Sequence, residues 1–206
     1  MELIIENLSK RFAQTWALQD VSLRLEAGMV GLVGPNGAGK TSLIRIINQI
    51  TAPDSGEVYF NGQKLNQSHI NRIGYLPEER GLYKKMEIGE QMIYLARLKG
   101  LSRDEAQKRL KFWFEKLGME TWWKKKIEEL SKGMQQKAQF VATVLHEPEL
   151  IILDEPFNEL DEASEIALLT HFRQQAQNGK MVILITHNKQ SLSFCNKIVS
   201  LDGSTI

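Results

Sequence analysis

The hydrophobic positions of the chain form short apolar runs that alternate with longer segments of helical period. Three runs are almost continuously apolar, at 29–33 (MVGLV), 150–153 (LIIL) and 181–186 (MVILIT). Runs of this length, rich in Val and Ile, are typical of strands that are buried on both faces of a parallel sheet. We therefore expect a parallel sheet.

Other short runs alternate between apolar and polar residues, at 2–7 (ELIIEN), 21–26 (VSLRLE) and 57–60 (EVYF). Such alternation is typical of half-exposed antiparallel strands. A further short strand is predicted at 197–201 (KIVSL). The predicted class is α/β, with a mixed parallel sheet and an antiparallel β portion on the N-terminal side.

Helical period dominates the middle of the chain, where we predict helices at 87–99, 103–117 and 132–146. Gly100 and Gly118 lie between the first two and after the second, as glycines at helix ends do. No strand pattern interrupts this block. We interpret it as an inserted α-helical subdomain.

The length of 206 residues suits a single domain. We therefore expect one domain over 1–206, in which 1–77 and 148–206 form the α/β core and 78–147 form the inserted helical subdomain.

Composition excludes several classes of protein. The formal net charge of +1 gives no case for a general nucleic-acid binder, which would be clearly basic. Cys195 is the single cysteine, which fits a reducing compartment, and we expect a core thiol there.

The N-terminus lacks a secretory pattern, and no apolar run approaches the roughly 20 residues that span a bilayer. Any membrane role is therefore expected to come from a partner chain.

The stretch GLVGPNGAGKTSLIRI follows the first apolar run and opens a helix. Gly34, Gly39, Lys40 and Thr41 match the pattern G-x-x-x-x-G-K-S/T, and the strand before it and the helix after it are the context that confirms a phosphate loop. Glycines let backbone N–H groups face phosphate oxygens, and the helix adds its positive end. Lys40 would reach the β- and γ-phosphates, and the Thr41 hydroxyl would bind Mg²⁺. The core is thus predicted to be that of a P-loop NTPase.

Acidic residues and a histidine follow the other two buried runs. Asp154 and Glu155 come directly after 150–153, and His187 follows 181–186. The carboxyl ends of such strands face the crevice where α/β proteins bind ligands. Asp154 is placed to hold Mg²⁺, and Glu155 to polarise a water aimed at the γ-phosphorus. His187 would donate a hydrogen bond to a γ-phosphate oxygen or orient the attacking water.

In order along the chain, GPNGAGKT, IGYLPEERGLY, LSKGMQQ, LIILDEP, LD at 160–161 and TH at 186–187 resemble the ATP-binding subunits of ABC transporters over nearly the whole chain. The segment 76–101 is similar to the export-type subfamily that includes sodium and drug exporters. The resemblance implies ATP and Mg²⁺ as ligands and ATP hydrolysis coupled to transport across a membrane.

Site residues are carried over position by position. An aromatic ring stacks on adenine, and Phe12 matches it by its position after LSK, with Trp16 as the alternative. LSKGMQQ matches the family's signature motif, and Asp161 matches a loop acid at the dimer seam. The implied ATP-binding residues are Phe12, Gly34, Pro35, Asn36, Gly37, Ala38, Gly39, Lys40, Thr41 and Ser42. The residues implied for catalysis are Glu155, His187 and Lys40, and those implied for binding Mg²⁺ are Thr41, Asp154 and Glu78. The signature motif, which would act on the other chain's ATP, comprises Ser131, Lys132, Gly133 and Met134.

Three positions depart from the family pattern. Lys132 and Met134 replace a Gly and the Gln of L-S-G-G-Q, while Ser131 and Gly133 are kept. Lys132 is expected to point to solvent rather than add charge near the nucleotide. Glu78 stands where the family has a glutamine that touches Mg²⁺ and senses the membrane partner. It would bind the metal more tightly or turn toward a basic group when Mg²⁺ is absent.

The resemblance also implies partners. Two subunits would face each other head to tail, as a homodimer formed on ATP binding, with each ATP between one phosphate loop and the other chain's signature motif. Ser131 would cap the following helix, whose N-terminal end would face the γ-phosphate. A separate permease would be contacted through residues 79–88, on the inner face of the cell membrane. Family subunits commonly extend beyond a final strand such as 197–201, so we expect a further C-terminal portion.

The alternative is a non-transport ATPase of the same type, acting on DNA or ribosomes. The DNA class needs long coiled-coil arms between the phosphate loop and the Asp–Glu pair, and no heptad run lies between Lys40 and Asp154. The ribosome class usually carries two cassettes in one chain, and this sequence has one. A phosphate-loop protein that binds nucleotide without hydrolysis is disfavoured by Glu155.

Overall fold

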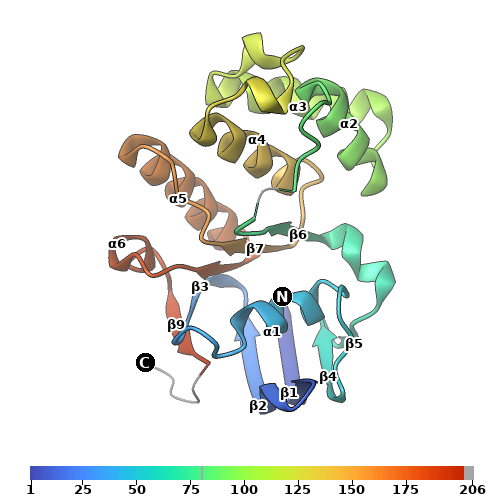
Figure 1. Cartoon of the computed structure of the whole chain (residues 1–206), viewed down its shortest axis with the longest axis vertical. Coiled ribbons are helices and arrows are strands. Elements are labelled where there is room, and N and C mark those ends of the chain that lie inside the picture. Colours follow the sequence, from blue (N-terminus) through green and yellow to red (C-terminus); the bar gives the residue numbers. More distant parts are fainter. Residues whose placement is uncertain (80, 202–206) are drawn as a thin grey trace.

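The computed structural model describes residues 1–79 and 81–201. Figure 1 shows the chain in layers, with an antiparallel sheet below, a parallel sheet across the middle and a group of helices above. Arg80, within the predicted permease segment, lies outside the described residues.

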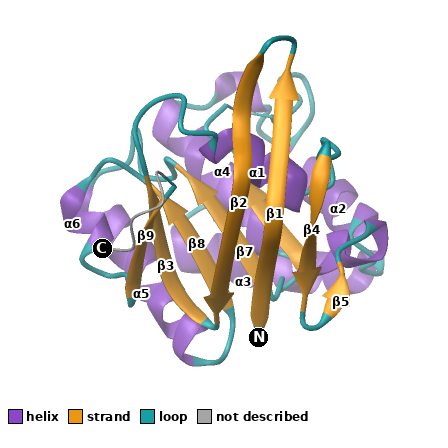
Figure 2. Ribbon diagram, turned by 90° about the horizontal axis from the view of Figure 1, so that it is seen from below, coloured by secondary structure: helices purple, strands orange, loops and turns teal. Residues whose placement is uncertain are grey.

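The antiparallel sheet has the strand order β2-β1-β4-β5. Its strands are β1 (Glu2–Phe12), β2 (Thr15–Glu26), β4 (Ser55–Phe60) and β5 (Gln63–Lys64). β1 and β2 are longer than predicted because their hairpin pairing runs out to Phe12 and Thr15, as the long ribbon in Figure 2 shows. Leu3 and Ile5 alternate with more exposed residues and are buried, which confirms the half-exposed pattern.

The second sheet has the order β6-β7-β8-β3-β9, and its pairs are parallel. Its strands are β3 (Gly28–Val33), β6 (Ile73–Leu76), β7 (Leu150–Asp154), β8 (Met181–Ile185) and β9 (Lys197–Ser200). Every residue of β7 and β8 is buried, as expected for a sheet covered on both faces. The antiparallel strands form a separate sheet rather than a part of this one.

Alternate residues of the parallel strands face two hydrophobic cores. On β7, Ile152 packs with α1 (Lys40–Ile47) and the antiparallel sheet, whereas Ile151 and Leu153 pack with the remaining helices. Those helices include α5 (Glu162–Gln177), whose Phe172 is fully buried. A short helix, α6 (Lys189–Leu192), follows β8.

The helices α2 (Ile88–Leu98), α3 (Arg103–Leu117) and α4 (Lys132–Val144) lie where the sequence predicts them. Three 3₁₀ helices also lie among the described residues: η1 (Gln67–Arg72), η2 (Glu120–Trp122) and η3 (Ile127–Glu129). Ser102 and Glu105 form a capping box at the start of α3, and Gly118 ends it in a left-handed conformation. In the part of the chain that the structure describes, no helix combines the length and apolarity needed to cross a bilayer.

Gly39 joins the phosphate loop to α1 in a conformation that a side chain would disturb. Its φ is 91°, and a Cβ built there would lie 2.1 Å from the carbonyl oxygen of Ala17. Gly37 has a similar φ of 84°, but a Cβ there would meet no atom within 4 Å. Both positions thus need a backbone conformation that favours glycine, but only Gly39 also lacks room for a side chain.

We expect Gly37→Ala to lower the free energy of unfolding by about 1 kcal/mol, the cost of a left-handed Ala. Gly39→Ala is expected to lower it by a further 1–3 kcal/mol or so, because the methyl group overpacks against Ala17. Urea unfolding in the absence of nucleotide measures both. Equal losses for the two variants would show that the contact with Ala17 does not constrain the loop.

Candidate functional site

A cleft of about 700 Å³ opens where the parallel strands end and joins segments that are far apart in the sequence. The phosphate loop follows β3, and Glu78 follows β6. Asp154 is the last residue of β7, Glu155 comes directly after it, and His187 follows β8. The predicted site residues that line the cleft are Asn36, Gly37, Ala38, Gly39, Lys40, Thr41, Ser42, Glu78, Asp154, Glu155 and His187. The fold thus brings most of the predicted site together.

The ammonium group of Lys40 is held by its own loop. Its Nζ donates to the carbonyl oxygens of Gly34 at 2.6 Å and Pro35 at 3.0 Å. These two residues therefore position the lysine, while the loop residues after them line the cleft. Lys40 is also the first residue of α1, so the positive end of that helix faces the same space. The arrangement suits a phosphate group.

Three carboxylates, those of Glu78, Asp154 and Glu155, line the same cleft as the phosphate loop. Asp154 is only 7% exposed, and burial together with the nearby charges of Glu78 and Glu155 raises its pKa to about 6, which Lys40 partly opposes. Carboxylates that repel one another in a partly buried site are suited to bind a cation, because its positive charge offsets the repulsion. Among the described residues, no three His, Cys, Asp or Glu side chains form a ready metal cluster. A cation here would therefore need the Thr41 hydroxyl and oxygen atoms from its ligand.

Glu155 is fixed by the turn after β8. Its two carboxylate oxygens accept hydrogen bonds from the Thr186 hydroxyl and the His187 backbone N–H, each at 3.1 Å. Its backbone has a φ of 44°, which a non-glycine residue adopts at a cost. The His187 ring nitrogen Nε2 lies 3.7 Å from the same carboxylate. Thr186 was not assigned a role from the sequence, although the Thr-His pair after a buried strand was the available signal.

Two aromatic rings lie on the β1–β2 hairpin, and both are about half exposed. Trp16 lines the cleft beside the phosphate loop. Phe12 is not among the described residues that line it, and the ammonium group of Lys10 lies 5.5 Å from the centre of its ring. The hairpin thus provides one ring at the phosphate cleft and a second ring outside it.

The signature residues lie apart from the phosphate loop of the same chain. Ser131 caps α4 by accepting a hydrogen bond from the Met134 backbone N–H at 3.3 Å, as predicted for a helix start. Lys132 is exposed, but it also forms an ion pair with Glu159 at 3.1 Å, which the sequence did not suggest. Met134 is half-buried against the helical core. None of Ser131, Lys132, Gly133 or Met134 lines the phosphate cleft in the part of the chain described.

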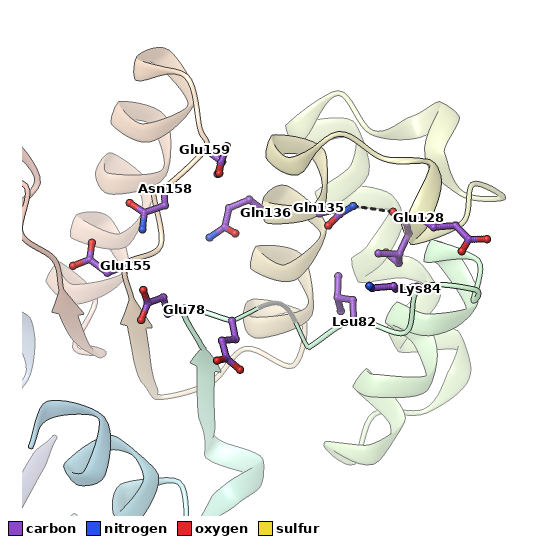
Figure 3. A pocket seen from close by; sticks show the side chains of 11 residues that line it. Glu78, Leu82, Lys84, Glu128, Gln135, Gln136, Glu155, Asn158 and Glu159 are labelled. Carbon is purple, nitrogen blue, oxygen red and sulfur yellow. Dashed lines mark hydrogen bonds between the residues drawn. The ribbon is translucent and has the colours of Figure 1, made fainter. Parts of the chain in front are cut away.

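A second groove adjoins the phosphate cleft and has a volume of about 680 Å³. Figure 3 shows its lining from the segment after β6, from α4 and from the loop after β7. Glu78, Glu155 and Asn158 line both spaces, so the groove runs into the phosphate cleft. Asn158 was not singled out from the sequence. Asp161, at the end of the same loop, caps α5 through the Ser164 backbone N–H at 2.8 Å.

Known proteins that are similar to this chain are described as ABC transporter ATP-binding proteins or subunits. A family model described as "ABC transporter" matches residues 18–158. An uncharacterised ABC transporter ATP-binding protein of Bacillus subtilis, YhaQ, is 44% identical over 188 residues, which cover 91% of this chain and 63% of the relative. The chain therefore spans less than two thirds of that relative's length.

An uncharacterised ABC transporter ATP-binding protein of Methanocaldococcus jannaschii, MJ1023, is 37% identical and covers 96% of this chain and 72% of its own length. A solved structure described as the ATP-binding subunit of an ABC transporter superposes with a TM-score of 0.88 at 32% identity, covering 97% of this chain and 85% of its own. The chain belongs to the ABC transporter family and is related to its ATP-binding subunits.

Proposed function

We propose that the chain binds and hydrolyses ATP and that this activity powers a membrane transporter. The observation that carries the proposal is the convergence, in one cleft, of the phosphate loop with the buried Asp154 and the fixed Glu155. The segment 78–147 acts as the helical subdomain of a single ATPase domain whose core is 1–77 and 148–206.

The roles of the individual groups follow from their positions. The loop N–H groups and Lys40 bind the β- and γ-phosphates. Thr41, Asp154 and Glu78 would hold Mg²⁺, which supplies positive charge against the phosphate oxygens when bound. Glu155 accepts the proton of the attacking water, and the hydrogen bonds from Thr186 and His187 keep its carboxylate in place. His187 is exposed above this carboxylate, where it can contact the γ-phosphate.

The signature residues complete the site of a second copy of the chain. Ser131 and the first N–H groups of α4 form the positive end of a helix, yet they lie away from the phosphate cleft of their own chain. A head-to-tail homodimer gives this helix end a γ-phosphate to bind. Asp161 then lies at the seam between the two copies. Loss of the γ-phosphate removes these contacts and opens the dimer.

A permease subunit docks on the segment 79–88. Leu82 lines the groove beside the helical core, and Tyr83 is 58% exposed. Met86 is half-buried on the same segment. An exposed aromatic ring between two half-buried apolar side chains suits contact with a short segment of a membrane partner. The chain then acts on the inner face of the cell membrane. The export direction rests on the resemblance of the segment 76–101 alone.

Glu155→Gln is expected to bind Mg-ATP, to form a stable dimer and to turn over at least about 100-fold more slowly than the parent, because the general base is lost. Size-exclusion chromatography with light scattering and a phosphate-release assay measure both effects. Lys40→Ala is the matched control, which is expected to lose ATP binding and to remain monomeric. A strictly monomeric Glu155→Gln protein, or a dimer that forms equally well with Lys40→Ala, would contradict the scheme.

The two hairpin rings can be separated by substitution. The adenine of ATP is separated from the phosphates by the ribose, so a ring outside the phosphate cleft, such as that of Phe12, suits the base. Trp16 lies nearer the phosphate loop. We expect Phe12→Ala to weaken ATP binding by about tenfold, the value of one stacked base, and Trp16→Ala to weaken it less. Titration with a fluorescent ATP analogue measures this, and the reverse order would assign the adenine contact to Trp16.

A further inference from the structure

Three polar side chains project from one face of α4 toward the two loops that carry the acidic site residues. They are Lys132, Gln136 and Gln139, at positions i, i+4 and i+7 of the helix, a spacing that places side chains on the same face. Both glutamines are almost fully buried, at 6% and 4% exposed. Buried amides in an otherwise apolar helix face need specific partners.

Gln136 is bonded to the loop after β7. Its Nε2 donates to the carbonyl oxygen of Pro156 at 2.7 Å, and Pro156 directly follows Glu155. Figure 3 shows Gln136 extending from α4 toward the loop that carries Glu155 and Asn158. At the start of the helix, Lys132 pairs with Glu159 of the same loop at 3.1 Å, and both side chains are partly exposed. The helix is therefore joined to this loop at two points.

Gln139 is bonded to the segment after β6. Its Nε2 donates to the carbonyl oxygens of Pro77 at 3.0 Å and Glu79 at 3.3 Å, the residues on either side of Glu78. The other amide atom, Oε1, is buried and has no hydrogen-bond partner among the described atoms. An unpaired buried acceptor is unfavourable. The two hydrogen bonds that Nε2 donates are therefore the contacts that favour a glutamine at this position.

The backbone at the start of α4 lies close to the backbone of the loop after β7. A Cβ built on Gly133 would lie 2.8 Å from the carbonyl oxygen of Glu159. The apolar residues of α4, such as Phe140 and Val141, are buried in the helical core. The helix cannot shift along the loop without breaking these contacts.

We propose that Gln136 and Gln139 are positioning residues that tie Glu155 and Glu78 to the signature helix of the same chain. This inference rests on the proposed function. In the dimer, Ser131 and Gly133 at the start of α4 contact the ATP held by the partner. The same helix holds the two acidic loops of its own ATP site, so occupation of one site sets the geometry of the other. The two glutamines are therefore the contacts through which ATP in the partner's site acts on the acidic residues of this chain's own site.

The test uses Gln136→Met, Gln139→Met and the double variant in the full chain, because Met keeps the volume and removes the donors. Thr143→Val is the matched control on the same helix, since its hydroxyl donates to Tyr75 and Gln139 carbonyls rather than to the loops with Glu78 and Glu155. We measure the ATP Kd of the monomer, kcat, and the Hill coefficient for ATP.

Each glutamine variant is expected to lower kcat by about fivefold, the value of one hydrogen bond. The ATP Kd should stay within about twofold of the parent, because the phosphate loop is untouched. The Hill coefficient should fall toward 1 in the double variant. A kcat and Hill coefficient equal to those of Thr143→Val would overturn the inference, as would a loss of kcat that is matched by an equal loss of ATP affinity.

Hydrogen exchange separates failure of this inference from failure of the proposed function. If the parent chain does not hydrolyse ATP, the proposed function fails, and the loops are then judged by exchange alone. Amides in residues 78–79 and 157–161 are expected to exchange faster in the double variant than in the parent or in Thr143→Val. Unchanged exchange in both loops would show that the amides do not position them, whatever the activity.

Discussion

The parallel pairing of β3, β6, β7 and β8 is the constraint on which the site depends. Parallel strands end at the same edge, and the register pairs Leu76 with Leu153 and Asp154 with Ile185. The phosphate loop, Glu78, Asp154 and His187 come from four distant segments, and each directly follows or lies close to the end of one of these strands. A one-residue change of register would turn the buried side chains toward the other core and separate these groups.

The two hydrophobic cores on either side of this sheet support different parts of the site. The core beneath includes α1 and the antiparallel sheet, so it supports the phosphate loop and the hairpin with Phe12 and Trp16. The core above includes α4 and the other helices, so it supports the signature residues. Side-chain bonds from α4 cross from this second core to the acidic loops. A ligand that contacts the start of α4 can therefore act on those loops through these bonds.

The elements with a strong local pattern were predictable from the sequence. The continuous apolar runs became β3, β7 and β8, and the helical period with its glycine ends located α2 and α3. β6 escaped notice because it is only four residues long and includes Gly74. The extension of β1 and β2 was missed because Arg11 and Phe12 are exposed, so hairpin pairing, rather than burial, makes them strand.

The site was predictable where a motif has its own chemistry, as in the phosphate loop, and less so where a contact joins distant segments. Thr186 and Asn158 have ordinary side chains whose roles depend on the turn that holds them. Lys132 is exposed, but no sequence pattern relates it to Glu159, its ion-pair partner. Gln136 and Gln139 look like helix-surface residues by type, and only the packing of α4 against both acidic loops makes them buried.

In the proposed dimer each ATP site is shared between two copies of the chain, and ATPase activity per molecule, measured against protein concentration, tests this sharing. A shared site predicts a rate per molecule that rises with concentration and levels off once the dimer is saturated. A rate per molecule that stays constant from dilute monomer upward would show that one chain contains a complete site, and would rule out a shared one.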